Sequence, residues 1–371
     1  MKKKTAAILV TSAILALAGC SSNSGSTEAE TTAAETTTAA ETTTAAASEA
    51  ESTEGESAEA SEEAAEPISG SLTVYTSQPE ADIQALIEAY NEVQPDVEVQ
   101  VFRSGTEEVV SKVLAEKQAG ALQADVLLVA DAPTFESLKS EDLLMSYESP
   151  ELDGISEEYY DADHTYTGTK IISTGIVVNT DIIDAEITSL KDLTKPEFKD
   201  EVIMPSPLYS GAAAYNLSVL TKTEGFGWDF YQQLKDNGVK VDKGNGSVQT
   251  AVVAGEKGLG MLADYMAFRS KADGAPVEFI YPSEGSLIVT EPIGIVNGTA
   301  HEAEAKSFVD FILSEEGQEA TAEIGYTPVR SGVAAPEGFR SVDEITNLTY
   351  DTAELAASRE ADKEQFSQMF E

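Results

Sequence analysis

The amino-acid sequence predicts an α/β fold in which helices cover a mostly parallel β-sheet. Residues 72–76 have the composition of a strand, and apolar side chains then recur at helical spacing between residues 83 and 90. A short, continuous apolar run follows at 125–130, which is typical of a parallel strand buried on both faces. Because strand and helix patterns alternate between these points, we expect a doubly wound sheet.

The segments between these landmarks continue the alternation. Pro95 ends the first helix, and valines at 97, 99 and 101 alternate along a second strand. A turn at 103–106 leads into a second helix, whose apolar positions lie between 110 and 114. The first part of the folded chain is therefore expected to run strand, helix, strand, helix, strand.

The second half of the chain contains the same kinds of unit. Small or polar residues precede two of its helices, at 206–211 and 243–247. A further helix is expected at 303–313, and the chain ends in a polar segment of helical character from 342 to 371. The expected strands of this half lie at 175–179, 202–205, 259–262, 277–281 and 293–296.

The first twenty residues have the features of a bacterial lipoprotein signal. Lysines at 2–4 precede an apolar stretch at 5–18, which is shorter than the roughly 20 residues of a membrane span. The stretch ends in Leu-Ala-Gly-Cys, which resembles a lipobox: small residues precede a thiol that accepts the lipid. We predict a lipoprotein signal peptide at 1–19 and a lipidated Cys20. The alternative is an ordinary cleaved signal with an incidental cysteine.

Residues 20–66 are predicted to form a disordered linker. After Cys20 the segment consists only of Ser, Thr, Ala, Glu, Gly and one Asn, with twelve Glu and no Lys or Arg. Such a composition cannot bury enough apolar surface to offset the entropy of the chain. We therefore expect a self-repelling spacer that holds the folded part, residues 67–371, away from the lipid.

Charge and composition argue against several classes of protein. The chain has a net charge of −43, and −34 remains in residues 67–371 once the three lysines and twelve glutamates before them are set aside. Nucleic-acid binding needs clustered cations, so no nucleic-acid partner is expected. A single cysteine excludes a disulfide framework and a Cys-rich zinc site. GxGxxG, Walker, HExxH, CxxC and Gly-x-Ser-x-Gly motifs are absent, so neither an enzyme nor a cofactor is expected.

Several short motifs occur in a characteristic order between residues 70 and 335. They are VYTS at 74–77, ADV at 124–126, TGIVVNT at 174–180, PSPLYSG at 205–211, GNG at 244–246, YPSEG at 281–285 and FVDFILSEEG at 308–317. With these motifs behind a lipobox, the chain resembles the extracellular solute-binding proteins of ABC importers. Within them it resembles the branch that includes ferric-ion, phosphonate and sugar-phosphate binders, which are type II periplasmic binding proteins.

The resemblance implies a two-lobed periplasmic-binding-protein fold with a hinge, in which the ligand binds between the lobes. Crossing strands would join the lobes near 175–179 and 291–296. The implied solute-binding domain, 67–371, would divide into lobe one at about 70–175 and 295–340, lobe two at about 180–290, and a helical tail at 341–371.

Four loops between a predicted strand and a predicted helix supply candidate ligand contacts. Backbone N–H groups and the positive end of a helix dipole face the crevice at such places, which favours an anion. The alternative at each loop is a helix cap or a turn without a ligand. The candidate residues are Thr76, Ser77 and Gln78; Ser104, Gly105 and Thr106; Ser210, Gly211 and Ala212; and Asn245.

Further candidates follow from the resemblance. Sugar-phosphate binders of this kind use acids that accept hydrogen bonds from sugar hydroxyls, and Asp264 with Tyr265, and Glu284, lie at matching places. Asp264 could instead cap a helix, and Glu284 could be a turn residue. Arginines could clamp an anion or could be paired on the acidic surface; they are Arg103, Arg269 and Arg330.

Ferric-ion binding is the main alternative ligand chemistry. Ferric binders of this branch use adjacent tyrosines after the lobe-two strand, because phenolate is a hard oxygen donor. At that place the sequence has Asp264-Tyr265-Met266, so one of the two tyrosines is absent. Tyr209 and Tyr265 remain as candidate metal ligands, and no other metal site is predicted.

The predicted function is capture of a small anionic solute, which the protein delivers to an ABC permease in the membrane. A phosphorylated sugar or a phosphonate is favoured over ferric ion. The protein is expected to be a monomer, exported and anchored through Cys20 to the outer face of the cytoplasmic membrane. Two alternatives of other classes are a solute sensor for a membrane kinase or chemoreceptor and a structural lipoprotein.

Overall fold

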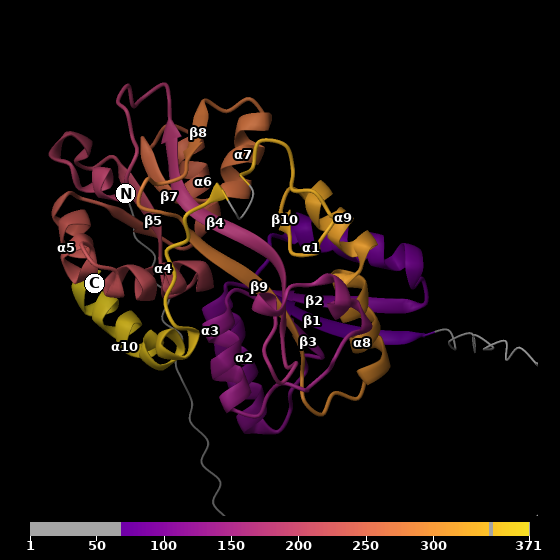
Figure 1. The fold of residues 1–371 in the computed structure, drawn as a ribbon. Coiled ribbons are helices and arrows are strands. Elements are labelled where there is room, and N and C mark those ends of the chain that lie inside the picture. The colour runs from indigo at the N-terminus through magenta and orange to yellow at the C-terminus, as the bar shows by residue number, and fades with distance from the viewer. Residues whose placement is uncertain (1–67, 341–343, 371) are drawn as a thin grey trace, which may run out of the picture. The chain divides into compact units, whose positions relative to one another are not determined.

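The computed structural model describes residues 68–340 and 344–370 (Figure 1). The predicted signal peptide at 1–19, the lipidated Cys20 and the linker at 20–66 lie outside these residues. Within them the α/β prediction is confirmed, because helices pack on both faces of one mixed sheet. The sheet is therefore the central layer of the described residues.

The described strands form one ten-stranded sheet. Its order is β2-β1-β3-β9-β4-β7-β5-β6, and β8 and β10 also pair with β4. The strands are β1 (Gly70–Thr76), β2 (Val97–Arg103), β3 (Val126–Leu128), β4 (Thr167–Asn179), β5 (Val202–Pro205), β6 (Lys240–Asp242), β7 (Leu259–Ala263), β8 (Val277–Ile280), β9 (Leu287–Ile295) and β10 (Thr327–Pro328).

The direction of pairing changes along the sheet. β2, β1 and β3 are parallel to one another at one side, and β7, β5 and β6 are parallel at the other. Between them β9 and β4 pair antiparallel with each other and with their outer neighbours β3 and β7. Two parallel α/β units are thus joined through two long antiparallel strands. We call the unit around β1, β2 and β3 lobe one and the unit around β5, β6 and β7 lobe two.

Helices cover both lobes. They are α1 (Glu80–Val93), α2 (Thr106–Ala119), α3 (Ala132–Ser140), α4 (Gly211–Lys222), α5 (Gly227–Asp236), α6 (Asn245–Val253), α7 (Asp264–Ala272), α8 (Glu302–Leu313), α9 (Glu315–Ile324) and α10 (Thr352–Phe370). Short 3-10 helices lie at Pro150–Gly154, Glu157–Tyr159, Leu190–Thr194 and Pro196–Phe198.

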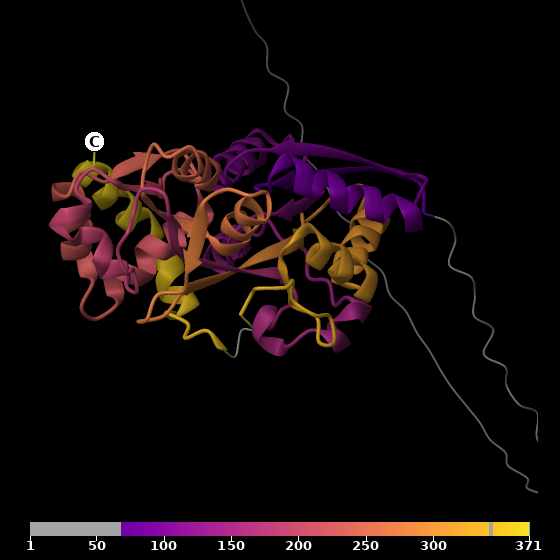
Figure 2. The same ribbon diagram turned by 90° about the horizontal axis from the view of Figure 1, so that it is seen from above.

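Each lobe has its own apolar core. In lobe one, the strand residues Leu72 and Val74 pack with Tyr90 of α1 and Phe308 of α8, and all four are fully buried. Figure 2 shows α8 and α9 beside the indigo α1, although the two helices come late in the chain. In lobe two, β5 and β7 pack against α4 and α6. The apolar cores of the two lobes are therefore separate clusters.

The strands β4 and β9 are longer than predicted. The predicted strand at 175–179 is the end of a strand that begins at Thr167, and the predicted strand at 293–296 is the end of one that begins at Leu287. Thr169, Lys170 and Ser173 interrupt the apolar pattern of β4, yet they are buried. Polar residues in the interior of a joining strand therefore concealed its first half.

The helical tail predicted after residue 341 contains α10, which packs against α3 of lobe one and α4 of lobe two. Leu355 and Phe366 join the core of lobe two. Arg359 forms ion pairs with Asp131 and Glu107, whose helices α3 and α2 belong to lobe one. The last helix thus contacts both lobes.

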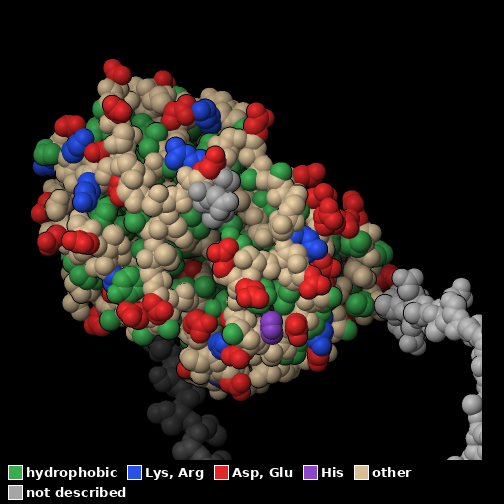
Figure 3. All heavy atoms as spheres, in the orientation of Figure 1, with side chains coloured by type: hydrophobic (Ala, Val, Ile, Leu, Met, Phe, Trp, Pro, Cys, Tyr) green, Lys and Arg blue, Asp and Glu red, His purple; other side chains and the backbone are tan. Residues whose placement is uncertain are grey.

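Acidic side chains dominate the surface. In the face seen in Figure 3 they are scattered over the folded part rather than gathered in one patch. This distribution agrees with the expectation that the negative charge belongs to a solvated surface. In the part of the chain that the structure describes, no helix combines the length and the apolar composition needed to cross a membrane.

Candidate functional site

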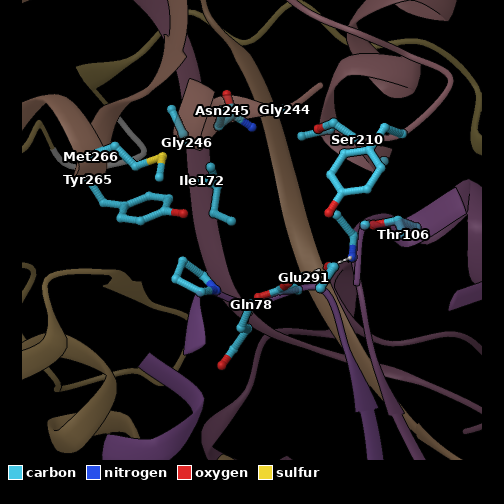
Figure 4. A pocket seen from close by; sticks show the side chains of 18 of the residues that line it. Gln78, Thr106, Ile172, Ser210, Gly244, Asn245, Gly246, Tyr265, Met266 and Glu291 are labelled. Carbon is cyan, nitrogen blue, oxygen red and sulfur yellow. Dashed lines mark hydrogen bonds between the residues drawn. The ribbon is translucent and has the colours of Figure 1, made fainter. Parts of the chain in front are cut away.

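A cleft of ≈ 640 Å³ lies between the lobes. Its walls come from the starts of helices in both lobes, and its floor comes from β4 and β9. Figure 4 shows Tyr265 and Met266 on one side, Ser210 and Thr106 on the other, and Gln78 and Glu291 below and between them. Both lobes therefore contribute to a single polar site of a size that suits a small molecule.

Five of the described helices begin at the cleft: α1, α2, α4, α6 and α7. The N–H groups of a first helical turn lack intrahelical acceptors and carry the positive end of the helix dipole. α1, α2 and α7 each have an acidic residue in the first turn, whereas α4 and α6 have none. The residue that precedes α6 is Gly244, which has no side chain to cap the helix. α4 and α6 therefore offer uncompensated positive ends to the cleft.

Glycines allow the two lobes to approach closely at one edge of the cleft. A Cβ atom on Gly211 would lie 2.5 Å from the Ala130 carbonyl oxygen and 2.7 Å from the Thr106 hydroxyl oxygen. A Cβ atom on Gly105 would lie 2.6 Å from the Tyr209 ring. The Glu107 N–H donates a hydrogen bond of 3.3 Å to the Tyr209 carbonyl oxygen at the same place. Only glycine fits these two positions while the lobes are in contact.

Two cations and two carboxylates line the cleft. Arg103 donates from Nε to the Gln78 carbonyl oxygen at 2.8 Å, and Lys243 Nζ lies 4.3 Å from the centre of the Tyr209 ring. Glu80 and Glu291 are the carboxylates. Because side-chain charges balance along the lining, an anion would be held by helix starts and hydroxyls more than by a basic pocket.

A buried ion pair lies at the floor of the cleft, where Glu291 is part of the lining and its partner Lys170 is not. Lys170 Nζ of β4 lies 2.5 Å from Glu291 Oε2 of β9, and the residues are 1% and 4% exposed. Ser77 Oγ and Gln78 Nε2 each donate to the Glu291 carboxylate at 3.1 Å. The Lys170 ammonium also lies 4.9 Å from the centre of the Tyr326 ring. These contacts satisfy the two charges and fix the carboxylate in the strand that joins the lobes.

Most of the predicted ligand residues line this one cleft. They are Ser77, Gln78, Gly105, Thr106, Ser210, Gly211, Ala212, Asn245 and Tyr265. The structure brings them together because the strands of each lobe end toward the other lobe, so the loops that follow those strands meet.

The other four predicted residues do not line the cleft. Thr76 is buried and donates to the Leu128 carbonyl oxygen at 2.8 Å, and the hydroxyl of the half-buried Ser104 donates to the Glu108 carboxylate. Asp264 and Glu284 were expected to accept hydrogen bonds from a sugar, but each accepts hydrogen bonds from the protein itself.

Asp264 is fully buried at the start of α7. Its Oδ1 accepts from the backbone N–H groups of Tyr265 at 2.9 Å and Ser173 at 3.3 Å. Burial raises the pKa of this carboxyl group to about 7, because desolvation of the charged form outweighs those hydrogen bonds. Asp264 thus connects α7 to the backbone of β4.

Glu284 stabilises a turn of lobe two instead of facing the cleft. Its Oε1 accepts from the Leu190 backbone N–H at 2.6 Å and from the Ser189 hydroxyl at 3.1 Å. A side chain with these partners holds the start of the 3-10 helix Leu190–Thr194. Glu284 is therefore a turn residue, which was the alternative to a ligand contact.

Arg269 and Arg330 are paired with carboxylates of the protein, as the alternative expected, but the pairs are partly buried and not on the open surface. Arg269 Nη1 of α7 donates to both oxygens of Asp82 in α1, at 2.9 and 3.0 Å, and so links lobe two to lobe one. Arg330 Nη1 lies 3.1 Å from Glu151 Oε2. Of the three candidate clamps, only Arg103 lines the cleft.

Three tyrosines line the cleft: Tyr209, Tyr265 and Tyr326. The Tyr265 and Tyr326 rings lie 4.3 Å apart, and Tyr326 donates to Asp82 Oδ2 at 2.5 Å. Burial, with nearby carboxylates adding to it, raises the pKa of both phenols. Both tyrosines therefore serve as hydrogen-bond donors near neutral pH. Within 68–340 and 344–370, no group of three or more His, Cys, Asp and Glu side chains could hold a metal ion.

The sequence prediction missed Lys170, Lys243, Glu291 and Tyr326. A usable signal existed for two of them, because Glu291 is the one acid in the otherwise uncharged stretch Leu287–Ile295 and Lys170 is the one charge in Thr167–Asn179. A charged side chain is almost never fully buried without a partner. A lone charge inside a buried strand therefore indicates a buried ion pair. No comparable local signal distinguishes Tyr326.

Comparison with known proteins gives a match to one family model and several relatives. Residues 85–347 match the family model described as bacterial extracellular solute-binding protein. An uncharacterized protein of Haemophilus influenzae is 30% identical over 263 residues, which cover 67% of this chain and 75% of that protein. The Fe(3+)-binding periplasmic protein of Serratia marcescens is 23% identical over 260 residues, with the same coverage of 67% and 75%.

Among solved structures, the periplasmic binding protein AfuA of Actinobacillus pleuropneumoniae, with fructose-6-phosphate bound, superposes with a TM-score of 0.76. Its sequence is 23% identical, and the match covers 81% of this chain and 99% of that chain. At this identity the likeness shows that the two proteins have the same fold.

Proposed function

Because the chain belongs to the family of bacterial extracellular solute-binding proteins, we propose that its cleft captures a small anionic solute for delivery to a membrane permease. The membership confirms the predicted resemblance and makes the chain a binding protein of the ABC importer family rather than an enzyme. A phosphorylated sugar or a phosphonate is the favoured solute.

The observation that carries the proposal is the pair of helix starts at α4 and α6. Their first turns have no acidic side chain, and their first residues are Gly211 and Asn245, preceded by Ser210 and Gly244. Small residues let an anion reach the backbone N–H groups, and the helix dipoles favour its charge. This recognition needs no basic pocket, so it suits a folded part whose net charge is strongly negative.

Capture would proceed by closure of the lobes about β4 and β9. A ligand that contacts both lobes stabilises the closed arrangement relative to the open one, which shifts the population toward closure. Gly211 and Gly105 permit the close contact at one edge, and the Arg269–Asp82 pair bridges the lobes elsewhere. Opening of these contacts at the permease would release the solute.

The N-terminal segments complete the proposal. A lipid on Cys20 would anchor the protein to the outer face of the cytoplasmic membrane, and residues 21–66 would act as the tether. The tether would let the binding domain sample solutes while it stays near the permease.

A thermal-shift screen of the protein, purified with a chelator, tests the proposal. The panel contains sugar phosphates, phosphonates, inorganic phosphate and ferric citrate. A compound that binds only the folded state raises the melting temperature as its concentration exceeds Kd. We expect shifts with phosphorylated compounds, and no shift with any of them would contradict the proposal.

A matched pair of variants then tests the α6 helix start. A Cβ atom at Gly246 meets nothing within 4 Å, so larger side chains fit there. Gly246→Asp places a carboxylate at the positive end of the helix and should weaken binding of a phosphate ester at least about tenfold. Gly246→Asn has nearly the same shape without the charge and should bind within about twofold of the wild type. Equal weakening by both variants would show that shape, not charge, matters.

Ferric ion is the second candidate solute, because Tyr209, Tyr265 and Tyr326 all line the cleft. One relative is named as an Fe(3+)-binding protein. Ferric ion binds phenolate, so it would have to displace the phenol protons of Tyr265 and Tyr326. Burial raises the pKa of both phenols, which makes this displacement harder. A visible phenolate-to-iron absorption band on addition of ferric citrate, lost in Tyr265→Phe, would establish this alternative.

A further inference from the structure

The cleft floor has features that anion binding does not explain. An anion would be attracted to the helix starts in the walls, yet the floor presents the Glu291 carboxylate and the Gln78 amide. Both side chains are almost completely buried, and neither is a donor available to a phosphate. A second part of the ligand must therefore face these groups if the ligand fills the cleft.

Gln78 is held in an orientation that leaves one atom unsatisfied. Its Nε2 donates to Glu291 Oε2 at 3.1 Å, which turns its Oε1 away from the carboxylate. That Oε1 is buried and has no hydrogen-bond partner among the residues that the structure describes. A buried acceptor without a donor is costly, and Gln78 is 1% exposed and lines the cleft. The floor therefore lacks a donor that a ligand could bring.

The Glu291 carboxylate can also accept one more hydrogen bond. A carboxylate offers about four lone-pair sites. Three of its donors are in place: Ser77 Oγ, Gln78 Nε2 and Lys170 Nζ. Gln78 Oε1 and this remaining site together form an acceptor surface, which we call the acceptor floor.

The acceptor floor carries no net charge. Lys170 lies 2.5 Å from Glu291 and compensates its negative charge within the protein. The other charged residues of the lining are the cations Arg103 and Lys243 and the carboxylate Glu80, so they supply no net negative charge to attract a second positive group. An ammonium group placed here would lose its hydration without gaining a net counter-charge, whereas a hydroxyl group would lose much less.

We propose that the acceptor floor binds neutral hydroxyl groups, so that the solute of this protein is a hydroxyl-bearing phosphate ester rather than an aminoalkyl phosphate or phosphonate. This inference rests on the proposed function, because it assigns the anionic end to the walls. Gln78, Glu291 and Lys170 are then the residues that determine specificity at the uncharged end of the ligand.

Four probes that share an anion test the inference by isothermal titration calorimetry. They are glycerol 3-phosphate, propyl phosphate, 3-aminopropyl phosphate and inorganic phosphate. We expect glycerol 3-phosphate to bind at least about tenfold more tightly than each of the other three, because they lack a hydroxyl-bearing chain. A site built to hydrogen-bond hydroxyls leaves its acceptors unpaired with propyl phosphate and meets an uncompensated charge with 3-aminopropyl phosphate.

Two variants locate the discrimination on the floor. Gln78→Met keeps the length of the side chain and removes the amide. It should reduce the preference for glycerol 3-phosphate over propyl phosphate at least about threefold. Lys170→Met uncovers the Glu291 charge and should shift the preference toward 3-aminopropyl phosphate. If Lys170→Met does not fold, Gln78→Met and the wild-type series still decide the inference.

The outcomes separate this inference from the proposed function. Equal affinity for glycerol 3-phosphate and propyl phosphate would overturn the hydroxyl assignment and leave anion capture standing. Tightest binding of 3-aminopropyl phosphate would overturn the neutrality of the floor. Binding of none of the four probes would overturn the inference, whereas anion capture is decided by the thermal-shift panel of sugar phosphates and phosphonates.

Discussion

The walls of the cleft present backbone N–H groups and small side chains at the starts of α4 and α6, beside larger side chains such as Tyr265 and Met266. The floor presents buried side chains of the joining strands and of the loop after β1, among them Glu291 and Gln78. The wall residues Ser210, Gly211 and Asn245 provide space and dipoles. The floor residues Lys170 and Glu291 provide specific atoms with fixed partners. A wall of this kind recognises charge, and a floor of this kind recognises hydrogen-bonding groups. The two regions should therefore respond differently to substitution.

The largest effect is expected from breaking the floor. Lys170→Met leaves the Glu291 carboxylate buried without its counter-ion, which should lower the free energy of unfolding by about 3–5 kcal/mol in urea titrations. The double variant Lys170→Met/Glu291→Gln removes both charges and should recover most of this loss. A loss below about 1 kcal/mol in the single variant would mean that the pair contributes little to the fold.

Asp264, which lies behind the wall at the start of α7, predicts an unusual pH dependence. Its folded-state pKa of about 7 is above the unfolded value of about 3.9, so the folded state binds more protons between these values. Its contribution to stability is full below about pH 4 and is lost as the pH rises toward 7, at about 1.4 kcal/mol per pH unit.

The measurement is the difference in unfolding free energy between the wild type and Asp264→Asn from pH 5 to pH 7. Asparagine does not titrate, so the wild type should lose stability relative to the variant as the pH rises across this window. Acids elsewhere titrate in both proteins and cancel from the difference. Parallel curves would show that Asp264 ionises normally.

These two regions also differ in how far the sequence predicts them. The wall loops are local signals, because a small or polar residue between a strand pattern and a helix pattern identifies a helix start, as at Ser210 and Gly244. The floor depends on register: Lys170 meets Glu291 only because β4 pairs antiparallel with β9. The lone charges of Lys170 and Glu291 within their strands are a local signal of burial. Pairing between strands so distant in sequence has no local signature, so the sequence could not predict that these two residues meet.

The same reasoning explains why the two acids that were predicted to contact the ligand do not line the cleft. Asp264 and Glu284 follow strands, as expected of cleft residues, but their carboxylates bind backbone N–H groups of Ser173 and Leu190. Position along the chain predicted that they lie after strands of lobe two. It could not predict which way each carboxylate turns, because backbone groups from other segments compete for it.

A smaller effect is expected at the contact between the walls. Gly211→Ala places a Cβ atom against the Ala130 carbonyl oxygen and the Thr106 hydroxyl, which should hinder closure and weaken ligand binding about tenfold. Gly246→Ala is the matched control, because its Cβ meets nothing within 4 Å. Calorimetric titration with a phosphate ester measures both. Equal affinities in the two variants would contradict closure at Gly211.

The smallest effect is expected at the caps of the wall. Ser210 Oγ accepts from the Ala213 N–H at 3.3 Å, so Ser210→Ala should cost about 1 kcal/mol in unfolding free energy. Ser104→Ala removes a hydroxyl that lies outside the cleft lining and donates to the exposed Glu108 carboxylate, so it should change the free energy of unfolding by less than about 0.5 kcal/mol. Urea titrations that measure the free energy of unfolding distinguish the two variants. A larger loss for Ser104→Ala would reverse the assignment of wall and surface.

The most direct test of the division between walls and floor is a crystal structure of the protein with glycerol 3-phosphate. We predict that the phosphate group lies within hydrogen-bond distance of the backbone N–H groups at the starts of α4 and α6. The hydroxyl groups should reach Gln78 Oε1 and Glu291. A phosphate bound at Gln78 and Glu291, or a cleft that stays empty at saturating ligand, would contradict the account.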